Sequence, residues 1–147
     1  MQDAKDFLGC GWAFPPTFRK DKGINGDDCY ALMVVGQKDI EESLHILLST
    51  SLGERVMFPQ FGCNLADYQF ESMSNTLIGF ITDMVSNAII YYEARIKMDN
   101  ITVSQPDSWD AIQGCLRINI DYTIRTTNSR YNYVYDFYIQ DGNTTIR

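Results

Sequence analysis

Apolar and polar residues alternate along two long stretches near the C-terminal end of the chain. The stretches cover residues 116–125 and 131–140, and a polar turn at 127–130 separates them. Because successive side chains of a β-strand point to opposite faces, a period of two predicts strands with one buried face. The two stretches therefore predict a long antiparallel hairpin. Two further apolar residues, Val134 and Tyr138, fall on its otherwise polar face.

Two upstream segments repeat their apolar residues with the period of an α-helix. The longer is predicted from about Ser74 to Lys97, and its apolar stripe consists of Leu77, Ile78, Ile81, Val85, Ala88, Ile89, Tyr92 and Ile96. The shorter is predicted to begin at Asp39, which forms a capping-box pattern with Glu42, and to end at Gly53. Its apolar residues are Ile40, Leu44, Leu47, Leu48 and Leu52.

Shorter apolar segments predict two more strands, at residues 30–35 and 101–104. The first thirty residues are expected to be irregular, because two adjacent prolines exclude a helix and residues 20–28 have the composition of a polar loop. Residues 53–70, which are rich in glycine and aromatic residues, are expected to form a loop between the helices.

These elements predict an α+β fold with two helices packed on one face of a mainly antiparallel sheet that ends in the long hairpin. Residues 1–29 would form an N-terminal arm, and residues 30–147 a single domain. Exposed aromatic side chains are unfavourable on a free monomer. We therefore expect the arm residues Trp12, Phe14 and Phe18 to dock either on the domain or on a partner.

Composition and charge narrow the classes of function. The 147 residues are 45% apolar and 21% charged, which is typical of one globular domain and excludes a disordered chain. Twelve basic and nineteen acidic residues leave a charge of −7, so nucleic acid and anionic membranes are not expected partners. The N-terminus lacks the pattern of a secretory signal, and the longest apolar runs are far shorter than the roughly 20 residues of a membrane span. We expect a cytoplasmic chain without membrane insertion.

Side chains that could hold a metal or a cofactor are few and scattered. The four cysteines form no C-x-x-C pair and are expected to be reduced thiols; they are Cys10, Cys29, Cys63 and Cys115. The single histidine, His45, lies at the edge of a predicted apolar stripe and is interpreted as a boundary residue. We therefore expect neither a metal centre nor a cofactor.

The loop after the first helix offers two alternative interpretations of its charges. Glu54, with Asp67 or Glu71, could form the carboxylate pair of a glycoside hydrolase, although so acidic a chain always contains some such pair. The adjacent Glu54 and Arg55 could instead form a local salt bridge, or each could bind a group elsewhere, including one on another chain.

Three stretches of the sequence together resemble a known family. They are LGCGWAFP at 8–15, DIEESL at 39–44 and LLSTSLGERVMFPQFGC at 47–63. The chain resembles the GPW-like baseplate wedge family, which includes wedge proteins of contractile phage tails, the TssE proteins of type VI secretion systems and sheath initiators of extracellular injection particles. The most specific part is L-x-T-x-x-G-E-R-x-x-x-P-x-x-G; Phe58 departs from the basic residue that many relatives carry.

The resemblance implies a structural protein rather than an enzyme. Family members stand in six copies around the tube, bind the wedge proteins and present a sheet to which the first sheath ring adds strands. The match to the family motif implies that the wedge-binding residues of this chain are Glu54, Arg55, Phe58, Pro59 and Phe61. The expected sheath-binding residues are Tyr131, Tyr133, Val134, Tyr135, Phe137, Tyr138 and Ile139.

We therefore interpret the chain as a sheath initiator that is assembled in the cytoplasm and then becomes part of the baseplate of a phage tail-like particle. Its expected partners are the sheath protein and the wedge proteins, with inner tube or hub proteins as further candidates that the arm residues Trp12, Phe14 and Phe18 could reach. One alternative is a baseplate-associated peptidoglycan hydrolase with Glu54 as its acid. The other alternative is a soluble adaptor of the same fold.

Overall fold

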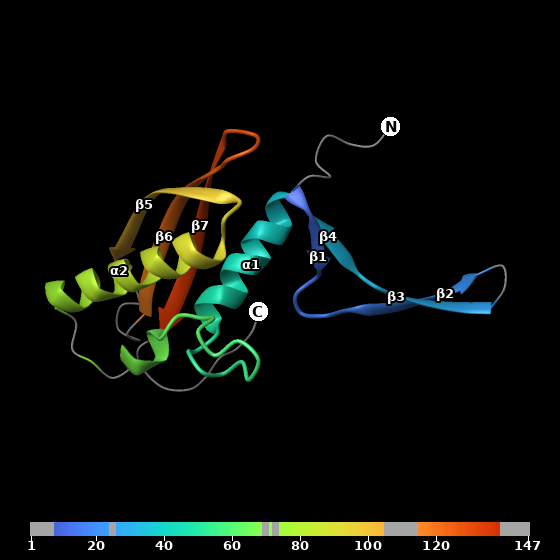
Figure 1. The fold of residues 1–147 in the computed structure, drawn as a ribbon, viewed down its shortest axis with the longest axis horizontal. Coiled ribbons are helices and arrows are strands. Elements are labelled where there is room, and N and C mark those ends of the chain that lie inside the picture. The colour runs from blue at the N-terminus through green and yellow to red at the C-terminus, as the bar shows by residue number, and fades with distance from the viewer. Residues whose placement is uncertain (1–7, 24–25, 69–70, 72–73, 105–114, 139–147) are drawn as a thin grey trace. The chain divides into compact units, whose positions relative to one another are not determined.

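The computed structural model of the chain describes most of its residues (Figure 1). The described residues are 8–23, 26–68, 71, 74–104 and 115–138. None of their helices is both long enough and apolar enough to cross a membrane. The chain forms two compact units, residues 1–44 and 45–147, and each is described by itself below. The division of the chain into an arm and a domain at residue 29 stays a prediction.

The first unit contains two antiparallel strand pairs. Strand β1 (Cys10–Trp12) pairs with β4 (Met33–Val35), and β2 (Phe18–Gly23) pairs with β3 (Gly26–Ala31). The expectation of an irregular N-terminal segment with a polar loop at 20–28 was therefore wrong. A periodic apolar pattern marks a strand with one buried face. The described side chains of β2 and the end of β3 are exposed or half-exposed, so this pattern is absent there.

Helix α1 (Gln37–Ser49) begins two residues before the predicted start and passes from the first unit into the second. Asp39 lies in its first turn rather than at its cap. The Glu42 carboxylate accepts a hydrogen bond from the backbone N–H of Phe14 (2.8 Å), which lies in the segment after β1. The predicted capping box was therefore wrong, because a tertiary partner takes the glutamate.

The second unit is built on a three-stranded antiparallel sheet with the order β5–β6–β7. Its strands are β5 (Ile96–Ser104), β6 (Cys115–Ile124) and β7 (Ser129–Tyr138). The hairpin of β6 and β7 confirms the predicted pair of strands and is in register over ten pairs. Strand β5 includes the predicted strand at 101–104 but begins earlier, and it contains a bulge between Met98 and Asn100.

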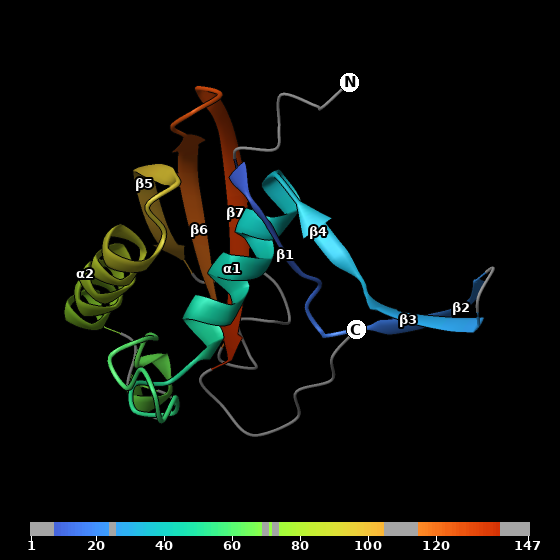
Figure 2. The same cartoon turned by 45° about the vertical axis from the view of Figure 1, so that its right-hand side comes forward.

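Helix α2 (Asn75–Tyr92) packs against β5. Ser74 is its N-cap, and the Ser74 hydroxyl oxygen accepts a hydrogen bond from the Leu77 N–H (3.1 Å). The helix ends at Tyr92 rather than near Lys97, because Ile96 is buried as the first residue of β5. In Figures 1 and 2, α2 and the last turns of α1 that belong to this unit lie on the same side of the sheet.

The two faces of the sheet differ sharply. The face toward the helices is apolar, and β6 alone contributes five almost completely buried side chains: Leu116, Ile118, Ile120, Tyr122 and Ile124. The opposite face carries cross-strand polar pairs. Arg117 forms an ion pair with Asp136 (2.8 Å), and the Asn132 amide donates to Asp121 (2.6 Å). This layered arrangement confirms the α+β class.

Candidate functional site

The loop of residues 53–63, here called the GER loop after its Gly-Glu-Arg start, is closed by two backbone hydrogen bonds. Gly53 N–H donates to the Pro59 carbonyl (2.7 Å), and Cys63 N–H donates to the Thr50 carbonyl (2.8 Å). Gly62 has a φ of 126°, and a Cβ on it would overlap the Thr50 carbonyl. Only glycine fits this close approach, which explains the glycine that ends the sequence motif.

The two adjacent charges of the GER loop each have a partner within the chain. A Glu54 carboxylate oxygen accepts a hydrogen bond from the Ser51 backbone N–H (2.9 Å). The Arg55 guanidinium lies over the Phe61 ring, 3.9 Å from its centroid, a cation–π contact. These partners differ from the local salt bridge that was one of the two interpretations of the sequence. Both side chains nevertheless remain exposed, so a second chain could still reach them.

Tyr92, the last residue of α2, ties the GER loop to the helix. Its hydroxyl donates to the Gln60 carbonyl (2.5 Å). Its ring lies 5.8 Å from Phe58 and 5.2 Å from Phe61, measured between centroids. Sequence reasoning assigned Tyr92 to the apolar stripe of the helix and missed this role, because the contact forms only where the helix ends. The predicted wedge-binding aromatics thus also shape the loop.

Strand β7 presents the predicted sheath-binding residues on two faces. Tyr131, Tyr133 and Tyr135 are half-buried on the helix side, where Phe137 is buried. Val134 and Tyr138 are exposed on the opposite face, and Ile139 lies outside the described residues. Because the faces alternate, a partner can contact all of these residues only by lying along the strand edge.

The helix side of β7 meets two groups from other elements. The Tyr135 ring lies 5.8 Å from His45 of α1, and the Tyr133 hydroxyl lies 3.4 Å from His45 Nδ1. Burial raises the pKa of the Cys63 thiol, at the end of the GER loop, to about 12. Burial and the neighbouring Cys63 also raise the pKa of Tyr135. Cys63, at the base of the GER loop, therefore lies near Tyr135 of the edge strand.

The three aromatic residues of the predicted arm are exposed and stand in or beside the strand pairs of the first unit. Trp12 belongs to β1, Phe18 begins β2, and Phe14 lies between them. The Trp12 and Phe18 rings meet edge to face at 6.2 Å. Their docking partner stays a prediction.

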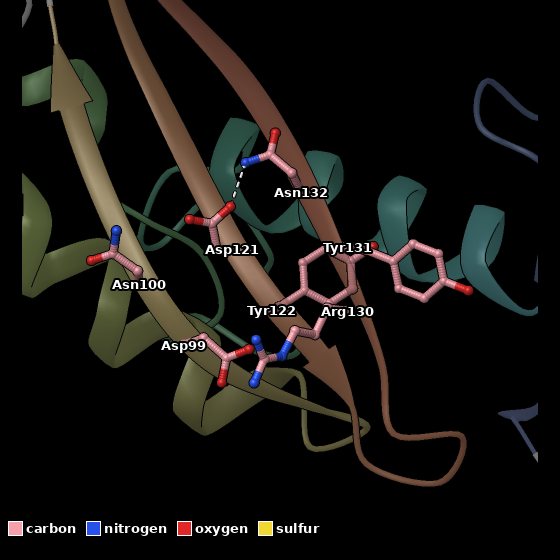
Figure 3. Close-up of a pocket in the computed structure, with 7 residues that line it drawn as sticks. All are labelled: Asp99, Asn100, Asp121, Tyr122, Arg130, Tyr131 and Asn132. Carbon is pink, nitrogen blue, oxygen red and sulfur yellow. Dashed lines mark hydrogen bonds between the residues drawn. The ribbon is translucent and has the colours of Figure 1, made fainter.

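An open pocket of about 550 Å³ lies where the three strands meet the hairpin turn (Figure 3). Its lining residues are Asp99, Asn100, Asp121, Tyr122, Arg130, Tyr131 and Asn132. Arg130 and Asp99 point toward one another in Figure 3. Asp99 and Asp121 already accept hydrogen bonds, from Thr123 and Asn132. Among the described residues, no three histidine, cysteine or acidic side chains gather to hold a metal ion.

The segment that contains α1, the GER loop, α2 and most of the sheet matches a known family. The sequence model of the family described as baseplate wedge protein gp25 matches residues 34–129, well over half of the chain. The chain belongs to the gp25 baseplate wedge family. The structural baseplate role implied by the sequence resemblance is thereby confirmed at the level of the family.

Individual relatives of this gp25-family chain support the assignment. The baseplate wedge protein gp25 of Enterobacteria phage T4 is 34% identical over 62 residues, 42% of this chain and 47% of that protein, so the chain spans about half the length of this curated relative. A Geobacter sulfurreducens structure named "putative tail lysozyme" is 40% identical, with a TM-score of 0.66, and the match covers 76% of this chain and 100% of that one.

Two large assemblies contain the same fold as this gp25-family chain. A chain of the anti-feeding prophage baseplate has a TM-score of 0.62 at 21% identity and covers 93% of this chain and 90% of its own length. A chain of the type VI secretion baseplate complex has a TM-score of 0.57 at 14% identity, with 69% and 92% covered. At these identities the likeness is one of fold. Membership in the family identifies the chain as a baseplate wedge component of contractile injection systems.

Proposed function

We propose that this baseplate component starts sheath assembly. The β7 edge accepts a strand from a subunit of the first sheath ring, and the GER loop attaches the chain to neighbouring wedge proteins. The protein acts as a template rather than as an enzyme. Six copies around the tube, as the family resemblance implies, would offer six such edges to one ring.

The edge of β7 carries this proposal. Strand β7 pairs with β6 along all ten residues and pairs with no other strand in the described part of the chain. The opposite edge, β5, is interrupted by the bulge between Met98 and Asn100. Bulges discourage pairing at sheet edges, whereas a long regular edge favours the addition of another strand. The sheet therefore has one edge suited to strand addition.

The side chains around this edge suit an incoming strand that has apolar residues at alternate positions. Toward the helices, such a strand would cover the half-buried rings of Tyr131, Tyr133 and Tyr135, which favours apolar residues at alternate positions. On the other face it would lie beside Val134 and Tyr138. Each new backbone hydrogen bond contributes only about 0.5–1.5 kcal/mol, but several copies bound to one ring raise the effective concentration of the next contact.

Proline substitutions test the edge directly. Neighbouring residues of an edge strand point their N–H groups alternately to the paired strand and to the open edge. Of the variants Tyr133→Pro and Val134→Pro, we therefore expect one to lose a bond to β6 and unfold more easily, and the other to remain stable because an outward N–H is lost. The stable variant should fail to capture the co-expressed sheath protein.

The same pair of substitutions on the other edge is the matched control. Of Ile101→Pro and Thr102→Pro in β5, the variant that keeps its thermal stability should still capture the sheath protein. If the stable β7 variant captures sheath as well as the wild type does, β7 does not accept the strand. A chain that captures neither sheath nor wedge proteins would instead fit the soluble adaptor.

A peptidoglycan hydrolase is the second candidate, because one similar structure bears the name of a tail lysozyme. Glu54, the acid considered for this activity, is exposed and accepts a backbone hydrogen bond, whereas a general acid needs surroundings that keep it protonated. It also does not line the pocket in Figure 3. Release of dye from labelled peptidoglycan by the wild type, abolished by Glu54→Gln, would establish this activity in place of a purely structural role.

A further inference from the structure

The apex of the GER loop is a tight turn made of unexpected residues. The turn is closed by a hydrogen bond from the Phe58 N–H to the Arg55 carbonyl (3.2 Å), and Val56 and Met57 occupy its two central positions. Such positions usually hold glycine, proline, asparagine, aspartate or serine, because these residues fit or solvate the turn backbone. Local turn chemistry therefore does not explain two large apolar side chains here. Local conflicts of this kind are typical of functional sites.

Val56 and Met57 also contribute nothing visible to the fold. They are 90% and 94% exposed, the highest fractions among the large apolar side chains of the described residues. Their neighbours behave differently, because Arg55 stacks on a ring and Phe58 packs against Tyr92. The loop thus separates residues that hold its shape from two residues that only face outward.

The turn is held firmly enough to present these side chains at a fixed place. Tyr92 binds the Gln60 carbonyl and packs on both phenylalanines of the loop, and Gly53 N–H bonds to the Pro59 carbonyl. A loop that is already ordered loses little conformational entropy when it binds. Apolar side chains on such a loop are good anchors, because burying them in a partner releases water at little ordering cost.

We infer that Val56 and Met57 are the anchor by which the GER loop enters a wedge protein, and that the surface which receives them is an apolar pocket. The inference rests on the proposed attachment of this loop to the wedge. It assigns the main contact to Val56 and Met57, which lie between the charged pair and the aromatic residues of the loop. Glu54 and Arg55 then shape the loop and line the rim of the contact. Methionine suits such a pocket, because its unbranched, polarizable side chain adapts to irregular walls.

Site-specific photo-crosslinking tests the contact. The photoreactive residue p-benzoylphenylalanine is placed at Met57, and the chain is co-expressed with the wedge proteins of the same particle. We expect an adduct with a wedge protein. The same residue placed at Asp83, an exposed position on α2, is the control and should give none. An adduct only with a second copy of this chain would overturn the inference in favour of self-association.

Affinity measurements separate this inference from the proposal on which it rests. Val56→Ser with Met57→Ser suits the turn and should leave the thermal stability unchanged, while the Kd for the wedge protein rises roughly ten- to hundredfold for each anchor side chain lost. Tyr91→Ala, an exposed aromatic outside the loop, is the control. If Glu54→Ala with Arg55→Ala weakens capture but the serine variant does not, the attachment stands and the anchor is wrong. If neither weakens capture, the attachment itself is wrong.

Discussion

The substitution Gly62→Ala tests whether the close approach within the GER loop is as tight as the structure shows. A Cβ at Gly62 would overlap the Thr50 carbonyl oxygen, and the φ of 126° is itself unfavourable for any residue with a side chain. The backbone conformation alone costs about 1–3 kcal/mol. Relief of the overlap must move the Thr50 carbonyl and weaken its hydrogen bond from Cys63, which adds about 1 kcal/mol or somewhat more.

The expected loss is therefore roughly 2–4 kcal/mol in the free energy of unfolding, or about 5–15 °C in Tm for a chain of this size. Two other glycines provide controls. Gly53 also has a positive φ, of 82°, but open space around its Cα. Gly53→Ala should therefore lower the free energy of unfolding only by the cost of the backbone conformation. Gly79 lies in α2 with open space beside it, so Gly79→Ala should gain roughly 0.5–1 kcal/mol.

Urea denaturation of the three variants, followed by circular dichroism, gives these free energies if the slopes agree. The expected order from most to least stable is Gly79→Ala, wild type, Gly53→Ala, Gly62→Ala. Equal free energies for Gly62→Ala and Gly53→Ala would refute the steric part of the argument, because only Gly62 combines a positive φ with an overlap of its Cβ on the Thr50 carbonyl.

Four further outcomes are expected. At pH 8 a thiol reagent should modify Cys10 and Cys29 rapidly but the buried Cys63 only after unfolding. Raising the pH from 9 toward 12 should lower the free energy of unfolding, because the folded state keeps the Cys63 proton that the unfolded state releases. Ser74→Ala should lower the free energy of unfolding by about 1 kcal/mol in urea titrations, through loss of the α2 cap. Phe137→Asp should abolish the cooperative thermal transition, because an unpaired charge would occupy a buried position.

The elements that could be predicted from the sequence are those whose pattern records burial on one face. The alternation along β6 and β7 has this property, and so does the apolar stripe of α2. The end of α2 was misplaced because Ile96 continues the helical period from Tyr92 although it begins a strand. Strands β2 and β3 were missed because neither has a periodic apolar pattern in its sequence.

The candidate site was predictable only in part, because motifs name residues without giving their contacts. The sequence predicted a loop around the Gly-Glu-Arg motif, and the structure has a loop there, while its wedge-binding role stays a prediction. It could not reveal that Glu54 would bond to a backbone N–H and Arg55 to a ring, because both partners are brought near by the loop's own folding. Tyr92 lies 32 residues from the carbonyl that it binds, and no local pattern encodes such a contact.

The polar outer face of the sheet has a consequence for the life of the chain before it joins a particle. A newly synthesised copy with an unpaired strand edge can aggregate with other copies. Stacking two such sheets face to face would strip water from the Arg117–Asp136 pair and from Asp121, which is unfavourable. Of these two modes of self-association, pairing at the β7 edge is therefore favoured over stacking of the outer faces.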